Sequence, residues 1–174
     1  MNEPIASRLP DGDFLLRDLT PWFLAELLRL PDLLRPDQPE HVRDRLYPLA
    51  SEGDEASQEE WRRLVHPELF ALLASARAVV EHDLESLDLG EGDEPGRLVI
   101  PAGHVQAWIS ALNAARLTLA ELHGVGQEEM NAAESGLPTD LGQEVVMAIA
   151  RIHLLAWLQE ALILTDQPRP GEER

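Results

Sequence analysis

The chain has 174 residues, of which 32 are Asp or Glu and 14 are Arg; it has no Lys and no Cys, so its net charge is −18. The lack of Cys excludes disulfides, thiol nucleophiles, thiolate zinc sites and iron–sulfur clusters. The charge disfavours binding to nucleic-acid phosphates or an anionic membrane and favours cationic partners. The length and the 44% share of apolar residues predict one folded domain, residues 1–165, and a disordered tail, 166–174.

The beginning of the chain predicts a hairpin followed by a helix. Residues 5–17 read as two short strands around a Pro-Asp-Gly-Asp turn, in which proline fixes φ and glycine tolerates a positive φ. Thr20 is a good N-cap and Pro21 suits the first helical position, so a helix should begin here. We expect it to end at about residue 30, because Pro31 follows.

The next part of the chain predicts three helices. A short helix is expected over 40–47, between two proline-containing segments. Ser57 and Glu60 form a capping-box pattern for a helix that ends at about residue 65. A longer helix is expected over 67–86, where apolar residues recur at steps of three and four and form one stripe. The stripe consists of Leu69, Leu72, Leu73, Ala76, Val80, Leu84 and Leu87.

The following segment predicts a strand and a second long helix. Residues 97–100 read as a short strand, and a helix over 102–123 should end at Gly124 in a C-cap position. A single helical turn is expected at 128–132. Because an isolated hairpin is only marginally stable, we expect the strand to pair with the N-terminal hairpin.

The last helix is expected to begin at Thr139 or Asp140 and to run to about residue 164. It is apolar on nearly all sides, so we predict that it is the central, buried helix of the fold. A membrane span needs about 20 nearly uninterrupted apolar residues. Four polar residues interrupt this helix, so we predict no membrane span: Arg151, His153, Gln159 and Glu160.

Together these elements predict a mainly α fold, a single-domain helical bundle of about five helices with a small β element made of the N-terminal hairpin and the short strand. The N-terminus has no basic segment followed by an apolar run, so we expect no secretion signal. With the absence of Cys, this favours a cytoplasmic location. The oligomeric state is left open.

Two helices carry residues from which a ligand site could be built: Trp108, Asn113, Arg116, His153, Trp157 and Glu160. Asn113 and Arg116 share one helix face, and the last three share a face of the final helix. If these faces pack together, Arg116 could pair with Glu160. Arginine grips carboxylates or phosphates, and tryptophan supplies a flat wall. The alternative is a structural ion pair in the helical core, with the tryptophans as core residues.

The same two helices resemble the bacterial DUF2017 family. The first contains Trp108–Leu117 (WISALNAARL) and then LAELHGV, and the second is Ile152–Leu162 (IHLLAWLQEAL). The family pairs a W-l-x-a-L-N-x-x-R-L-x-L helix with a final W-L-Q-E-x-L helix, and the match covers about residues 97–164. The resemblance implies a mostly helical fold and supplies little chemistry.

The resemblance also bears on partners. In actinobacteria the family's genes tend to lie beside the gene of the small adaptor of the Clp protease, which implies a possible protein partner. Some members carry a transcription-regulator label. The family's usual Asp after the Asn is Ala114 here, so the resemblance implies no role for that carboxylate.

No other pattern supports a metal, a cofactor or a catalytic centre; we predict no metal and no cofactor, and the catalytic activity is left open. The six His form no HExxH motif, and Gly-x-Ser-x-Gly, P-loop and dinucleotide-binding motifs are absent. Acidic residues crowd the segment 81–94 without an Arg between them, but they lack the spacing of an EF-hand. We interpret this segment as solvated, and a patch for a cation or a basic partner is the alternative.

We therefore interpret the chain as a non-catalytic protein-interaction module whose partner docks on an exposed apolar face. The first helix offers such a face with Trp22, Phe23, Leu27 and Leu30. One alternative is a small-molecule binding protein or enzyme that binds a carboxylate or phosphate through Arg116, Asn113 and Glu160, with His153 beside them. The other is a transcription regulator, which the negative charge disfavours.

Overall fold

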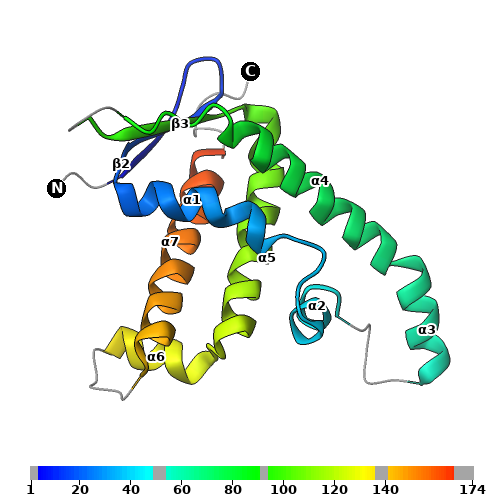
Figure 1. Cartoon of the computed structure of the whole chain (residues 1–174). Coiled ribbons are helices and arrows are strands. Elements are labelled where there is room, and N and C mark those ends of the chain that lie inside the picture. The colour runs from blue at the N-terminus through cyan, green and yellow to red at the C-terminus, as the bar shows by residue number, and fades with distance from the viewer. Residues whose placement is uncertain (1–3, 49–53, 91–93, 136–140, 167–174) are drawn as a thin grey trace.

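The computed structural model describes residues 4–48, 54–90, 94–135 and 141–166 (Figure 1). Within them the chain is mainly α-helical with one small antiparallel sheet, which confirms the predicted fold class. The predicted helix caps Thr139 and Asp140 lie outside the described residues, as does the predicted tail apart from Asp166.

The sheet has the strand order β1-β2-β3, with β1 at Ile5–Arg8, β2 at Phe14–Leu19 and β3 at Gly96–Ile100. Both pairings are antiparallel, so the predicted hairpin and its pairing with the later strand are confirmed. Alternate side chains of β3 point into the core, as expected for a sheet with one covered face, and β2 does the same apart from an irregularity between Leu16 and Leu19 that shifts its register. The inward side chains are at most 2% exposed: Phe14, Leu16, Leu19, Leu98 and Ile100.

Helix α1 spans Pro21–Leu33 and begins as predicted, because the Thr20 hydroxyl accepts a hydrogen bond from the Phe23 amide at 3.3 Å. The predicted end at residue 30 is wrong. Pro31 lies inside the last turn, where its missing N–H removes a single helical hydrogen bond and the helix continues. Helix α2, Glu40–Leu46, follows as predicted.

Helices α3, Glu55–Leu64, and α4, His66–Leu84, follow each other almost directly. The cap of α3 is Asp54 rather than the predicted Ser57, since the Asp54 carboxylate accepts from the amides of Ala56 at 2.8 Å and Ser57 at 3.1 Å. Helix α3 has no buried residue and, with the first half of α4, projects away from the rest of the molecule (Figure 1). We call residues 55–72 the arm.

The central helix is α5, Val105–His123, which follows a short 3-10 turn, η1, at Ala102–His104. It packs against α1, α2, α4 and α7, and eight of its residues are buried. It ends as predicted at Gly124, which has the left-handed φ of 61°. After it, α6 at Gln127–Ser135 is longer than the single turn expected.

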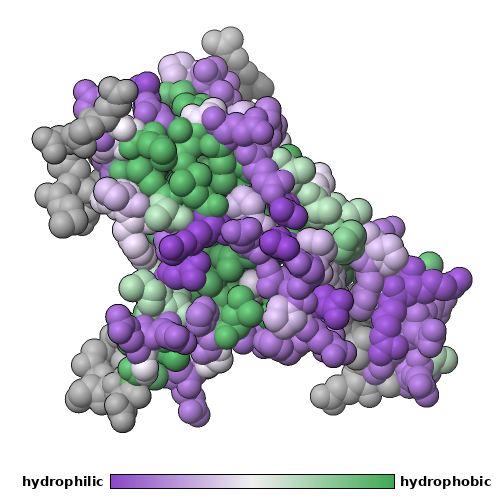
Figure 2. Space-filling view, viewed as in Figure 1, coloured by the Kyte–Doolittle hydropathy of each residue, from purple (hydrophilic) through white to green (hydrophobic). Residues whose placement is uncertain are grey.

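The last helix, α7 at Gln143–Asp166, lies along one side of α5 and is not the central helix that its composition predicted. One face packs on α5, and the other leaves apolar side chains exposed. Figure 2 shows apolar surface gathered over the end of α7 beside α1. The exposed large apolar residues of α7 are Val146, Met147, Ile163 and Leu164. Composition reports how apolar a helix is, but not how many neighbours cover it.

Residues Gln143–Leu164 of α7 are long and apolar enough to cross a membrane by length and composition alone, as are the core helices of many soluble domains. The exclusion made from the sequence was therefore too strict. In the described chain this helix is part of the packed domain. Arg151, in its middle, forms an ion pair with Glu26 of α1, and both side chains are largely buried.

Candidate functional site

The six candidate residues lie in separate surroundings, beginning with Trp108 of α5. Its side chain is fully buried, and its indole Nε1 donates a hydrogen bond to Asp83 Oδ2 of α4 at 2.8 Å. His104 Nδ1 lies 2.8 Å from Asp83 Oδ1. Trp108 is therefore an anchor between α4 and α5 and does not form the wall of a pocket.

The interpretation of 81–94 as solvated is wrong for Asp83, whose side chain is 3% exposed. The sequence carried a signal for this burial. Asp83 lies three residues after Val80 and seven after Ala76, so it falls on the buried stripe of α4. A carboxylate on such a stripe needs partners, which here are an indole and an imidazole.

Arg116 reaches α7, as expected, but its partner is Gln159 and not Glu160. The guanidinium Nη1 donates to Gln159 Oε1 at 2.8 Å, and Gln159 Nε2 donates to the carbonyl of Ile109 at 3.4 Å. Glu160 is exposed, because one step along a helix turns a side chain by about 100°. The predicted Arg116–Glu160 pair is therefore wrong. Arg116 Nε is buried without a hydrogen-bond partner.

The three remaining candidates face other directions. Asn113 lies on the side of α5 that faces α2 and α4. His153 is exposed on α7. Trp157 is partly buried, and its ring stands edge-on to Phe23 with centroids 5.8 Å apart. The structure thus brings Arg116 to the helix that carries Trp157 and Glu160, but it does not gather the six residues around one cavity.

Two hollows lined by described residues flank α2, and sequence reasoning identified neither. The first, of about 200 Å³, lies between α2, α4 and α5 and contains Asn113 and Ser110 at its polar side. Its remaining lining is apolar: Leu46, Leu69, Leu72, Leu73, Ala114 and Leu117. The stripe of α4 predicted a helix face packed in the core, but over the arm that face is only partly covered.

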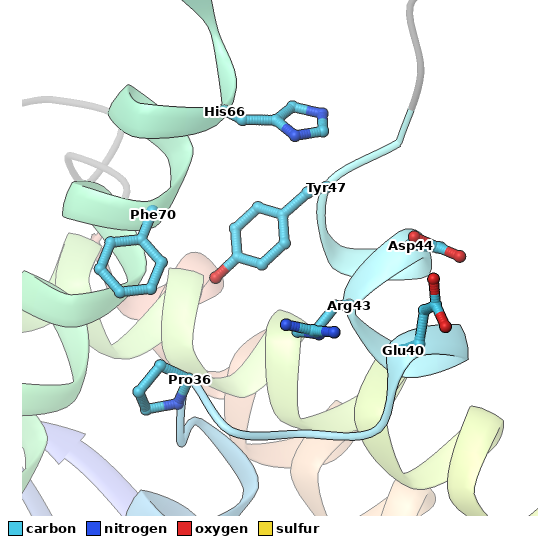
Figure 3. A pocket seen from close by; sticks show the side chains of 7 residues that line it. All are labelled: Pro36, Glu40, Arg43, Asp44, Tyr47, His66 and Phe70. Atoms are coloured by element: carbon cyan, nitrogen blue, oxygen red, sulfur yellow. The ribbon is translucent and has the colours of Figure 1, made fainter. Parts of the chain in front are cut away.

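The second hollow, of about 320 Å³, lies between α2, the segment before it and the start of α4 (Figure 3). We call it the Tyr47 pocket; it is lined by Pro36, Glu40, Arg43, Asp44, Tyr47, His66 and Phe70. The Tyr47 ring lies between two others, 6.0 Å from His66 and 6.4 Å from Phe70, centroid to centroid. Partial burial raises the pKa of Tyr47.

The predicted docking face on α1 is wrong. Phe23, Leu27 and Leu30 are at most 2% exposed and belong to the core, and only Trp22 of that set is exposed. The larger exposed apolar side chains on the arm are Leu64, Phe70 and Leu72. No group of three or more His, Asp or Glu within the described ranges is placed to hold a metal ion.

The fold defines a class: a mainly α domain built around one central helix, with a three-stranded sheet covering one end. The model of one family, a domain of unknown function (DUF2017), matches residues 12–165, and the chain belongs to that family. Comparisons with curated proteins and with solved structures find no match.

Proposed function

We propose that this protein is a non-catalytic protein-interaction module whose docking site is the apolar hollow between α2, α4 and α5. One observation carries the proposal: five leucines line a surface hollow of about 200 Å³, and one of them, Leu72, is 55% exposed. Side chains of this kind gain free energy when a partner covers them, about 25 cal/mol for each Å² of apolar area. An apolar groove between helices is a common seat for an amphipathic helix.

The charge of the protein supports a basic partner. The whole chain carries −18, and the arm contains four carboxylates against two arginines: Glu55, Glu59, Glu60 and Glu68 against Arg62 and Arg63. We therefore propose that the occupant is an amphipathic helix with Lys or Arg on its polar face. Such complementarity speeds association and weakens as salt screens it.

A photo-crosslinking amino acid placed at position 72, in the arm of the full-length protein, tests this proposal. The matched positions are Leu89, which is exposed far from the hollow, and Ile163, on the apolar end of α7. We expect position 72 alone to crosslink one protein, and the crosslinked peptide should be basic and amphipathic. Crosslinking from position 163 alone would place the docking site on α7 instead. The absence of any position-specific product would overturn the proposal.

The partner so identified should then be purified and its affinity measured by calorimetry. We expect Leu72→Glu to weaken binding at least about tenfold, because the introduced carboxylate would be desolvated on docking. Leu89→Glu should leave the affinity within about twofold. The family's gene neighbourhood makes the small adaptor of the Clp protease the first protein to test directly.

The alternative of a carboxylate or phosphate site at Arg116, Asn113 and Glu160 has less support. Arg116 is occupied by Gln159, and Asn113 and Glu160 point elsewhere. A thermal-shift screen of carboxylates and phosphates with the Arg116→Gln variant as control tests that alternative, since a ligand at 100 times its Kd adds about 2.7 kcal/mol.

A further inference from the structure

The Tyr47 pocket contains an arginine, Arg43, that forms no ion pair with a carboxylate of the described residues. Eight of the other arginines in the described chain form ion pairs with carboxylates, but none of these pairs involves Arg43. Figure 3 shows why: the guanidinium of Arg43 points beneath the Tyr47 ring, whereas the carboxylates of Glu40 and Asp44 lie together on the other side. A free guanidinium in a concave site is well suited to grip an anion.

A second polar group of the same pocket lacks a partner. His66 Nε2 is buried and makes no hydrogen bond. Most buried polar atoms have a partner, and one without a partner requires an explanation. A bound molecule that carries acceptor oxygens would satisfy Arg43, whereas His66 lies on the other side of the Tyr47 ring (Figure 3) and would not share those oxygens.

The rest of the lining specifies what that molecule looks like. Tyr47, Phe70 and Pro36 provide flat apolar walls, which suit a ring or a short hydrocarbon chain. A single arginine balances one negative charge. The acidic edge at Glu40 and Asp44 would repel a doubly charged phosphate more strongly than a monoanion.

We propose that the Tyr47 pocket binds a small organic monocarboxylate with an apolar body, its carboxylate on Arg43 and its body against the rings of Tyr47 and Phe70. This site goes beyond the interaction surface proposed above. It uses neither Leu72 nor any other residue of the apolar hollow, so either proposal can fail without the other.

The chain offers a direct reporter, because Tyr47 is its only tyrosine. Full-length protein labelled with 3-fluorotyrosine gives one ¹⁹F resonance, which reports on this pocket alone. We expect 3-phenylpropanoate to shift that resonance in a saturable way at millimolar concentration. The matched amine 3-phenylpropylamine and inorganic phosphate should not.

Two arginines on the same helix give a matched pair of variants. Arg43→Gln should weaken 3-phenylpropanoate binding about tenfold or more, since a hydrogen bond to a charged group is lost. Arg45 pairs with Glu121 outside the pocket. Arg45→Gln should therefore change the affinity less than about twofold. Circular dichroism would show that both variants are folded.

Three results would overturn the proposal. The first is saturable binding of the amine in preference to the carboxylate, which would assign the pocket to cations held by Glu40 and Asp44. The second is a response to phosphate alone. The third is an equal loss of affinity in the two arginine variants, which would show that general electrostatics, and not the pocket, controls binding.

Discussion

Asp83 and Trp108 are 25 residues apart in the chain, yet the indole Nε1 of Trp108 donates to Asp83 Oδ2 at 2.8 Å within the core. The same carboxylate contacts His104 Nδ1, so a single buried side chain joins the end of α4 to the start of α5. From this junction α4 extends outward to form the arm (Figure 1). The polar cluster thus holds the base from which the proposed docking surface projects.

Replacing Asp83 by Ala should therefore destabilise the whole domain. The buried indole N–H would lose its acceptor, and an unsatisfied buried donor costs about 1–3 kcal/mol. With the lost contact to His104, we expect the free energy of unfolding to fall by about 2–4 kcal/mol. Urea denaturation followed by tryptophan fluorescence measures this change.

The matched control is Glu85→Ala, two residues further on at the C-cap of the same helix, where the side chain is 77% exposed. We expect this variant to stay within about 0.5 kcal/mol of the parent protein. Equal losses in the two variants would show that the polar cluster around Asp83 does not stabilise the fold.

The second prediction concerns Arg151 and Glu26, which join α7 to α1. The Glu26 side chain is 5% exposed and also contacts Arg29, whose own side chain is largely in solvent. Arg151→Met would leave the buried carboxylate with this one exposed partner. We expect the free energy of unfolding to fall by about 3–5 kcal/mol, the cost of breaking a buried ion pair from one side.

A double variant, Glu26→Met with Arg151→Met, should recover much of that loss, because no buried charge then remains unpaired. Arg63→Met serves as the control, since its contact with Glu60 is a 4.0 Å pair between exposed side chains. A double variant that is less stable than Arg151→Met would contradict the idea that the unpaired carboxylate causes the loss.

These two clusters show where reasoning from the sequence stopped. Thr20, Gly124 and the hairpin turn act within a few residues of chain, so their patterns predicted the ends of elements well. The partners of Asp83 and Glu26 come from distant helices, and no local pattern names them. Arg116 binds Gln159 and not the expected Glu160 for the same reason, because its partner depends on the rotation of α7 against α5.

The arm and both hollows could not be predicted from the sequence either. The leucines of α4 have the spacing of a packed helix face, and that spacing is the same whether the face is covered by the domain or left for another molecule. In the structure Ala76 and Val80 are buried, whereas Leu72 on the same helix is exposed. Only the arrangement of α2, α4 and α5 separates the covered half of the stripe from the open half.

The third prediction concerns the start of the arm and its dependence on pH. Hydrogen bonds from the Ser57 hydroxyl and from the amides of Ser57 and Ala56 hold the pKa of Asp54 below its ordinary value of 3.8. Because the pKa is lower in the folded state, the charged cap stabilises α3 at pH values above 3.8. This contribution is lost as the pH falls below 3.8 and through the folded pKa.

We expect the amide resonances of Ala56 and Ser57 to titrate with a midpoint below 3.8, and the exchange protection of α3 to fall over the same pH range. Nuclear magnetic resonance measures both quantities. Asp54→Asn keeps a capping oxygen without an ionisable group and should remove this titration. A midpoint at or above 3.8 would show that Asp54 does not act as a charged cap in solution.

The last prediction separates backbone strain from packing at the end of the central helix. Gly124 has a φ of 61°, and a Cβ placed there would meet no atom within 4 Å. Gly124→Ala should therefore lower the free energy of unfolding by about 1 kcal/mol through backbone strain alone. Gly103 also has open space around it but no positive φ, so Gly103→Ala should be neutral or slightly stabilising. Thermal denaturation of the two variants measures the difference, and equal melting temperatures would mean that α5 does not need the left-handed residue at which it ends.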